Sequence, residues 1–167
     1  MNYTFVDHIL ELKEGKRILT TKNFTRTEDY LDEYYPRFDS VPNSLIVESM
    51  ASAAGLLLFS STQFESMAML LMIEEAKFTH PVQPADRILV EATLLALHAD
   101  AARLEAMVQV EEKSVASATL VLGCFEIQSL SDPQMKTFFT SLLNRTKNWM
   151  QRDIRRQAGG NRSAVII

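Results

Sequence analysis

The chain has 167 residues, of which 47% are hydrophobic and 23% are charged, which is ordinary for a globular protein with a single core. This composition excludes low-complexity disorder for the bulk of the chain. One cysteine, Cys124, excludes an internal disulfide and fits a reducing compartment. The N-terminal residues do not resemble a secretory signal, and no apolar stretch is long enough to span a bilayer comfortably. We therefore expect a cytoplasmic protein without a membrane span.

The net charge of −4 is unevenly distributed. Residues 131–167 contain seven basic and two acidic residues, a net of +5, so the remainder has 10 basic and 19 acidic residues, a net of −9. An acidic body does not favour nucleic-acid binding. The basic C-terminal segment has two interpretations: a solvated helix face, or a surface that meets an acidic partner.

The first elements differ in the spacing of their apolar residues. Residues 5–12 have helical spacing and predict a short helix. Residues 16–24 are rich in β-branched side chains and predict a strand. Residues 25–42 read as a polar, aromatic loop, and its two prolines keep it from joining either neighbouring element.

Residues 43–61, NSLIVESMASAAGLLLFSS, predict a helix that is apolar around nearly its whole circumference. Such a helix is usually buried within a domain. Its small residues would let other backbones approach closely. We expect this helix to lie at the centre of the fold.

The following residues predict an antiparallel meander. Strands are expected over 67–78, 88–97 and 115–127, with a short hairpin turn at 111–113. Between the second and the last of these, apolar and polar residues alternate, which predicts a strand with one buried face. The alternating sets are Leu104, Ala106, Val108 and Val110 against Arg103, Glu105, Met107 and Gln109.

The C-terminal region predicts an amphipathic helix. Asp132 and Pro133 suit the N-cap and the first helical position, and Gly159-Gly160 suits the end. The helix would pack through one apolar side, on the sheet or on a partner. That side comprises Met135, Phe138, Phe139, Leu142, Leu143, Trp149, Met150 and Ile154.

Together these elements predict an α+β fold in which an antiparallel sheet wraps around a buried central helix. We expect one domain over residues 1–130, the amphipathic helix over 131–158 and a loose tail over 159–167. The sheet would leave an edge strand that dimerisation could cover.

Glu48 stands out because a carboxylate within an apolar helix is costly unless it is paired or protonated. Burial would raise its pKa and suit it to general acid chemistry at neutral pH. Ser52 and Gly55 follow at helical spacing, so all three share one helix face. The alternative is that Glu48 sits at the helix start, favoured by the helix dipole and by loop donors.

The segment YYPRFDSVPNSLIVESMASAAG, residues 34–55, resembles the core motif of the FabZ/FabA-type 3-hydroxyacyl-[acyl carrier protein] dehydratases, approximately HFPGxPxxPGxLxxEAMAQxxG. Residues 5–31 and 76–95 resemble the family's N-terminal stretch and a later strand pair, and the likeness covers about residues 5–125. The matching positions of the core motif are Pro36, Pro42, Leu45, Glu48, Met50, Ala51 and Gly55.

The resemblance implies a hot-dog fold, usually a dimer, with an acyl chain on phosphopantetheine entering a tunnel at the subunit interface. It also implies that a histidine of one subunit takes the C2 proton while the helix carboxylate of the other, here Glu48, protonates the departing C3 hydroxyl. Backbone amides, one at Gly55, would polarise the thioester carbonyl. The carrier would be acyl carrier protein or coenzyme A, and no cofactor is expected.

The sequence departs from the family at the histidine position, which Tyr34 occupies. Tyrosine has an ordinary pKa near 10, so it is a poor base at neutral pH. The family's glycines are replaced by Arg37 and Asn43, and its glutamine by Ser52. We expect Glu48 and Tyr34 to be catalytic, and the remaining site residues to contact substrate: Gly55, Ser52, Asn43, Tyr35 and Arg37.

Three hypotheses follow for function: a dehydratase-like enzyme with a substituted partner for Glu48, a hot-dog thioesterase that uses Glu48 alone, and a non-catalytic acyl-thioester binder or subunit. The histidines His8, His80 and His98 show no ligand spacing with each other or with Cys124, so no metal site is predicted. Cys124 is expected to be a small buried strand residue.

Overall fold

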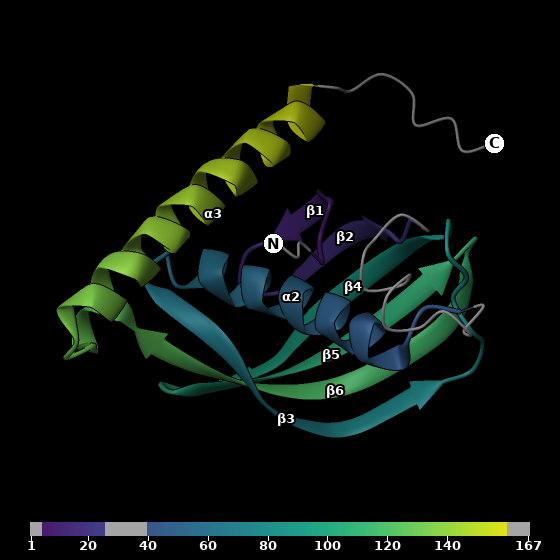
Figure 1. Cartoon of the computed structure of the whole chain (residues 1–167), viewed down its shortest axis with the longest axis horizontal. Coiled ribbons are helices and arrows are strands. Elements are labelled where there is room, and N and C mark those ends of the chain that lie inside the picture. The colour runs from purple at the N-terminus through teal and green to yellow at the C-terminus, as the bar shows by residue number, and fades with distance from the viewer. Residues whose placement is uncertain (1–4, 26–39, 160–167) are drawn as a thin grey trace.

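The computed structural model describes residues 5–25 and 40–159 of the chain (Figure 1). In the described part, six strands form one sheet in the order β1-β2-β4-β5-β6-β3, and all neighbours are antiparallel. The elements in chain order are β1 (His8–Lys13), β2 (Arg17–Asn23), α2 (Asn43–Ser61), β3 (Ser66–Phe78), β4 (Arg87–Leu97), β5 (Ala101–Val110), β6 (Lys113–Glu126), the 3-10 helix η1 (Ile127–Ser129) and α3 (Pro133–Gly159).

Helix α2 lies across one face of the curved sheet, which wraps around it (Figure 1). Ile46, Met50, Ala53 and Leu57 repeat at helical spacing and are at most 1% exposed, so one stripe of α2 is sealed against the strands. This is the hot-dog arrangement, and the predicted α+β class is confirmed. The predicted helix 43–61 has the bounds of α2. By length and composition α2 could also cross a membrane, but half of the apolar window is buried inside the fold, as in a core helix.

The meander also follows the sequence pattern. In β5 the residues Ala102, Leu104, Ala106 and Val108 are buried, while the polar residues between them face outward. The turn between β5 and β6 consists of Glu111 and Glu112, which have φ values of 48° and 66°. Positive φ at both central residues is the geometry of a type I′ hairpin turn, which matches the twist of antiparallel strands.

The predicted helix over residues 5–12 is wrong, because this segment forms strand β1. The register of β1 against β2 shifts between Ile9 and Glu11, which leaves Leu10 as an extra, bulged residue. A bulge brings residues three apart to the same face of a strand. Ile9 and Leu12 both contact the core, so a bulged strand produced the three-residue spacing that is also typical of a helix.

Helix α3 begins as predicted. Asp132 Oδ1 accepts hydrogen bonds from the backbone N–H groups of Gln134 (2.7 Å) and Met135 (3.3 Å), which satisfies two donors of the first turn. The expectation of one continuous packed apolar side is met only in the C-terminal half. Met150 is fully buried there, whereas Met135 and Phe138 near the start are 48% and 59% exposed.

A buried carboxylate fastens α3 to the first strand. Asp153 is 5% exposed, and its Oδ2 accepts a hydrogen bond from the backbone N–H of Ile9 at 2.5 Å. Its other oxygen lies 3.1 Å from Nδ1 of His8. Strand β1 is an edge of the sheet, so its outward N–H groups find no partner strand, and α3 supplies the acceptor for Ile9.

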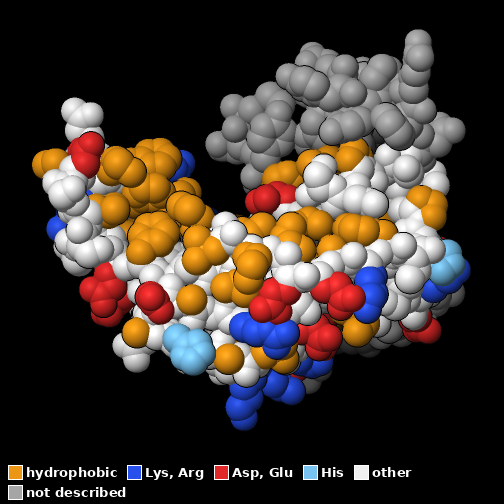
Figure 2. All heavy atoms as spheres, turned by 90° about the horizontal axis from the view of Figure 1, so that it is seen from below, with side chains coloured by type: hydrophobic (Ala, Val, Ile, Leu, Met, Phe, Trp, Pro, Cys, Tyr) orange, Lys and Arg blue, Asp and Glu red, His pale blue; other side chains and the backbone are white. Residues whose placement is uncertain are grey.

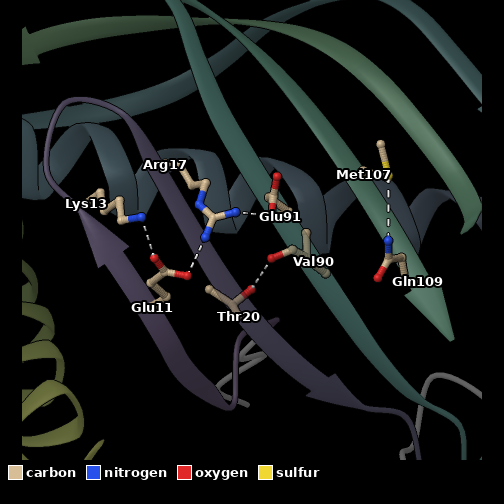
Figure 3. A network of polar contacts seen from close by, with 8 residues as sticks. All are labelled: Glu11, Lys13, Arg17, Thr20, Val90, Glu91, Met107 and Gln109. Atoms are coloured by element: carbon tan, nitrogen blue, oxygen red, sulfur yellow. Dashed lines mark hydrogen bonds and ion pairs between the residues drawn. The ribbon is translucent and has the colours of Figure 1, made fainter. Parts of the chain in front are cut away.

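The outer face of the sheet, away from α2, carries a charged network that joins three strands (Figure 3). Arg17 on β2 contacts Glu11 on β1 and Glu91 on β4, the latter at 2.8 Å. Lys13 lies 3.0 Å from Glu11. The hydrogen bond from Lys13 and the positive charge of Arg17 hold the pKa of Glu11 below its ordinary value of 4.5, although partial burial acts in the opposite direction.

We expect Asp153→Ala to lower the free energy of unfolding by about 1–3 kcal/mol, because the buried Ile9 N–H loses its acceptor. Urea unfolding followed by circular dichroism measures this. The matched control is Arg152→Ala, an exposed neighbour on the same helix, which should change stability by less than about 0.5 kcal/mol. Equal effects of the two variants would contradict the proposal that Asp153 holds α3 against β1.

Glu11 should make stability depend on pH. Its folded pKa lies below the unfolded value, so its contribution is present at neutral pH and is lost as pH falls below about 4.5 and through the folded pKa. The difference in unfolding free energy between the wild type and Glu11→Gln should therefore shrink between pH 7 and pH 3, because Glu11 of the wild type binds about one proton over this range. Urea titrations at several pH values measure this difference. A difference that stays constant or grows would refute this linkage.

Candidate functional site

An open groove of about 990 Å³ runs between α2, the first half of β3 and α3. Figure 2 shows hydrophobic side chains on both sides of a hollow in the described surface. The lining is mostly apolar, with Glu48 and Arg145 as its two charged residues in the described part of the chain. The lining residues are Phe5, Val6, Glu48, Ala51, Ser52, Gly55, Leu56, Phe59, Met67, Ala68, Met69, Leu70, Leu122, Leu142, Leu143, Arg145, Thr146 and Trp149.

Helix α2 presents Glu48, Ser52 and Gly55 to this groove. Their spacing places them on the helix face opposite to the stripe that is sealed against the sheet. The predicted common face therefore exists, and it combines a carboxyl, a hydroxyl and a glycine. A thioester in the groove would meet all three groups together.

Glu48 is exposed to solvent in this single chain, so the expectation of a carboxyl removed from water is wrong for the isolated protomer. The burial of α2 is one-sided, and Glu48 lies on the open side. The helix dipole does not account for Glu48, because the first turn of α2 contains no acidic residue and the dipole acts only within that turn. Most of the loop from which this alternative took its donors lies outside the described residues. No hydrogen bond or ion pair to Glu48 occurs among residues 5–25 and 40–159.

Gly55 is half-buried, and its position does not require glycine for packing. A Cβ atom there would meet Ala68 Cβ at 3.8 Å, an ordinary contact distance. Glycine weakens a helix by about 0.5–1 kcal/mol relative to alanine. What glycine adds here is a bare stretch of backbone along the groove, which a ligand can approach closely.

Of the other four predicted site residues, the structure describes only Asn43. Asn43 is the first residue of α2, is exposed and does not line the groove. Tyr34, Tyr35 and Arg37 lie outside the described residues. The structure therefore brings together three of the seven predicted residues on one surface, Glu48, Ser52 and Gly55.

Sequence reasoning missed the contribution of α3. It assigned the apolar side of this helix to packing, yet Leu142, Leu143 and Trp149 form one wall of the groove. Arg145 and Thr146 lie on the same wall. The only signal available in the sequence was the amphipathic pattern, which does not distinguish a packed face from a ligand-facing one.

The remaining candidates take no part in the groove. Burial, with a smaller effect of Asp100, raises the pKa of the Cys124 thiol, which keeps it protonated and a weak nucleophile. His80 and His98 are exposed, and His8 contacts Asp153. Across residues 5–25 and 40–159, no three histidine, cysteine or acidic side chains lie close enough to hold a metal ion.

Solved structures resemble this chain in fold. A Streptococcus mutans protein bound to acetyl CoA superposes with a TM-score of 0.59 at 14% identity, over 75% of this chain and 94% of that one. A Haemophilus influenzae thioesterase gives a TM-score of 0.59 at 16% identity, over 74% and 81%. Identities this low are evidence for a shared fold alone.

Some relatives found by sequence have higher identity to this chain than the two solved structures above. The 3-hydroxyacyl-[acyl-carrier-protein] dehydratase FabZ of Petrotoga mobilis is 33% identical over 121 residues, which cover 72% of this chain and 86% of that protein. FabZ of Hydrogenobaculum sp. is 30% identical over 128 residues, covering 75% and 86%. The model of the FabA-like domain matches residues 1–119, from the N-terminus into β6. The chain therefore belongs to the family of FabA-like domains, together with the FabZ dehydratases.

Proposed function

We propose that the protein is a dehydratase-like enzyme that acts on 3-hydroxyacyl thioesters of acyl carrier protein in fatty-acid or related acyl-chain biosynthesis. The observation that carries this proposal is the position of Glu48 beside Ser52 and Gly55 on an apolar groove, in a chain of the FabA-like family. The groove suits an acyl chain, and the carboxyl suits the chemistry at its polar end.

In this reaction Glu48 donates a proton to the C3 hydroxyl, which leaves as water. The proton on C2 passes to the oxygen of Tyr34, which must be ionised to accept it, and the electrons of the C–H bond form the C2–C3 double bond. Ser52 offers its hydroxyl near the thioester carbonyl, whose polarisation makes the C2 proton easier to remove, and the missing side chain at Gly55 leaves room for the thioester beside it.

A second copy of the chain would complete this site. Strand β3 is an edge of the sheet, and its apolar residues Met69, Leu71, Met72 and Ile73 are between 43% and 62% exposed. A long apolar edge strand favours pairing with another strand. Since Met67, Met69 and Leu70 also line the groove, a copy paired there would cover it and exclude water from Glu48. We therefore propose that the protein is a homodimer. We also propose that it acts in the cytoplasm.

Two other functions keep specific support. Tyr34 in place of the family's histidine favours a chain that binds acyl thioesters without dehydrating them, as a non-catalytic subunit. The fold likeness to the Haemophilus influenzae thioesterase favours hydrolysis, in which Glu48 would activate water against the carbonyl. In both cases the pantetheine thioester, on acyl carrier protein or coenzyme A, remains the ligand.

We expect Glu48→Gln to reduce formation of the enoyl product from 3-hydroxyacyl thioesters by roughly 10²–10⁴-fold, because the amide cannot donate the proton that the leaving hydroxyl needs. The assay follows enoyl absorbance and free thiol separately. Glu65→Gln, an exposed glutamate just beyond α2 that does not line the groove, is the matched control and should retain full activity.

The same assay separates the three functions. Thiol release from saturated acyl thioesters, without enoyl product, would replace the dehydratase proposal with hydrolysis. Binding of both thioesters without either product would establish the non-catalytic function. Enoyl formation that is equal in the wild type and in Glu48→Gln would exclude Glu48 as the acid.

The proposed dimer makes a separate prediction. Ile73→Lys places a charge on the apolar edge of β3, so light scattering should give the mass of one chain instead of two, and enoyl formation should fall with it. Leu95→Lys is the matched control, because Leu95 is a similarly exposed apolar residue on the interior strand β4. A dimer that survives Ile73→Lys but dissociates in Leu95→Lys would place the interface elsewhere.

A further inference from the structure

We propose that α3 is a ligand-binding element: the acyl chain of the thioester lies against Leu142, Leu143 and Trp149, and this helix selects ligands with long acyl chains. The inference rests on the proposed function for the position of the thioester near Glu48 and Gly55. It assigns a role to a helix that lies entirely beyond the residues matched by the FabA-like domain.

The wall that α3 forms is a single helix face. Leu142, Thr146 and Trp149 follow one another at helical spacing, and Leu143 lies beside them. Across the groove lies the open face of α2 with Glu48, Ser52 and Gly55. A ligand whose thioester reaches α2 would therefore have its acyl chain flanked by α3.

Helix α3 is held in this position from end to end. Near its start, Phe139 packs edge-to-face on Phe125 of β6 at 6.3 Å between ring centroids. In the middle, Lys147 Nζ lies 5.0 Å from the ring centroid of Phe64. Near its end, Met150 is fully buried and Asp153 accepts the hydrogen bond from Ile9. These contacts make α3 a fixed wall with a defined separation from α2.

The wall side chains still have free surface. Leu142, Leu143 and Trp149 are large and apolar, yet each is only half-buried, although Leu143 and Trp149 also pack against the core. Apolar surface left in water inside a concave, mostly apolar groove is typical of a small-molecule site. Covering it with an acyl chain would gain roughly fourfold in affinity for each buried methylene.

The size and charge of the groove define the ligand class. About 990 Å³ is at the upper end of the usual range for ligand sites, so a short acyl group would leave most of the α3 wall in water. The two charged residues of the lining, Glu48 and Arg145, lie on opposite walls, and the surface between them is chiefly apolar. A long, uncharged acyl chain meets these conditions better than a short or a charged one.

Trp149 allows a direct test because it is the only tryptophan in the sequence. Thioether analogues of butyryl and dodecanoyl pantetheine, which cannot be hydrolysed or dehydrated, would be titrated into the full-length protein while its fluorescence is recorded. We expect the dodecanoyl analogue to shift the emission of Trp149 to shorter wavelength, and to bind at least roughly 100-fold more tightly than the butyryl analogue.

Leu142→Asn tests the wall itself, because Leu142 lines the groove without belonging to the residues packed on the core. It should weaken dodecanoyl binding by about tenfold or more and change butyryl binding by less than about twofold. Phe138→Asn is the matched control, since Phe138 is an exposed apolar residue on the same helix outside the groove. Trp149→Phe, read by calorimetry, keeps the wall apolar and should retain chain selection.

Equal affinity for the two analogues, or equal effects of Leu142→Asn and Phe138→Asn, would overturn the inference. So would binding of the dodecanoyl analogue that leaves the emission of Trp149 unchanged. The binding assay needs no turnover, so its outcome is independent of catalysis. Selective binding without dehydration would refute the proposed enzyme alone, whereas dehydration without chain selection would refute the role of α3 alone.

Discussion

The contact on which the rest of this structure depends is the packing of one apolar helix, α2, on the curved sheet. Four residues on one stripe of α2 are almost completely buried, and the strands pack their inner faces against them. These residues are Ile46, Met50, Ala53 and Leu57. Burial of apolar surface is the main favourable contribution to such a fold. Because one stripe of α2 faces the sheet, the opposite stripe must face outward, and this stripe carries Glu48, Ser52 and Gly55.

This one-sided packing leaves two apolar surfaces on the isolated chain, the groove and the edge strand β3, and they share Met67, Met69 and Leu70. In the proposed dimer, a copy paired at this edge would also limit the access of water to Glu48. The carboxyl, which is exposed in one protomer, would then acquire the dry surroundings that favour proton transfer. Helix α3 contributes the third side of the same groove.

Much of the fold could be predicted from local patterns. The bounds of α2, the alternation in β5, the turn at Glu111 and Glu112 and the cap of α3 by Asp132 all reflect interactions between residues close in sequence. The first strand could not, because a bulge at Leu10 gives Ile9 and Leu12 a spacing that suits helix and strand equally. The bulge becomes visible only when β2 pairs with that segment.

For the site, local sequence was enough to place Glu48, Ser52 and Gly55 on one helix face, because helical spacing is a local property of the chain. Packing between distant segments set the rest: this face looks away from the sheet, Glu48 is exposed in one protomer, and Leu142 and Trp149 form the facing wall. The two walls of the groove come from residues about 90 to 100 positions apart. An amphipathic pattern shows which face of a helix is apolar, but it does not show which segment or ligand covers that face.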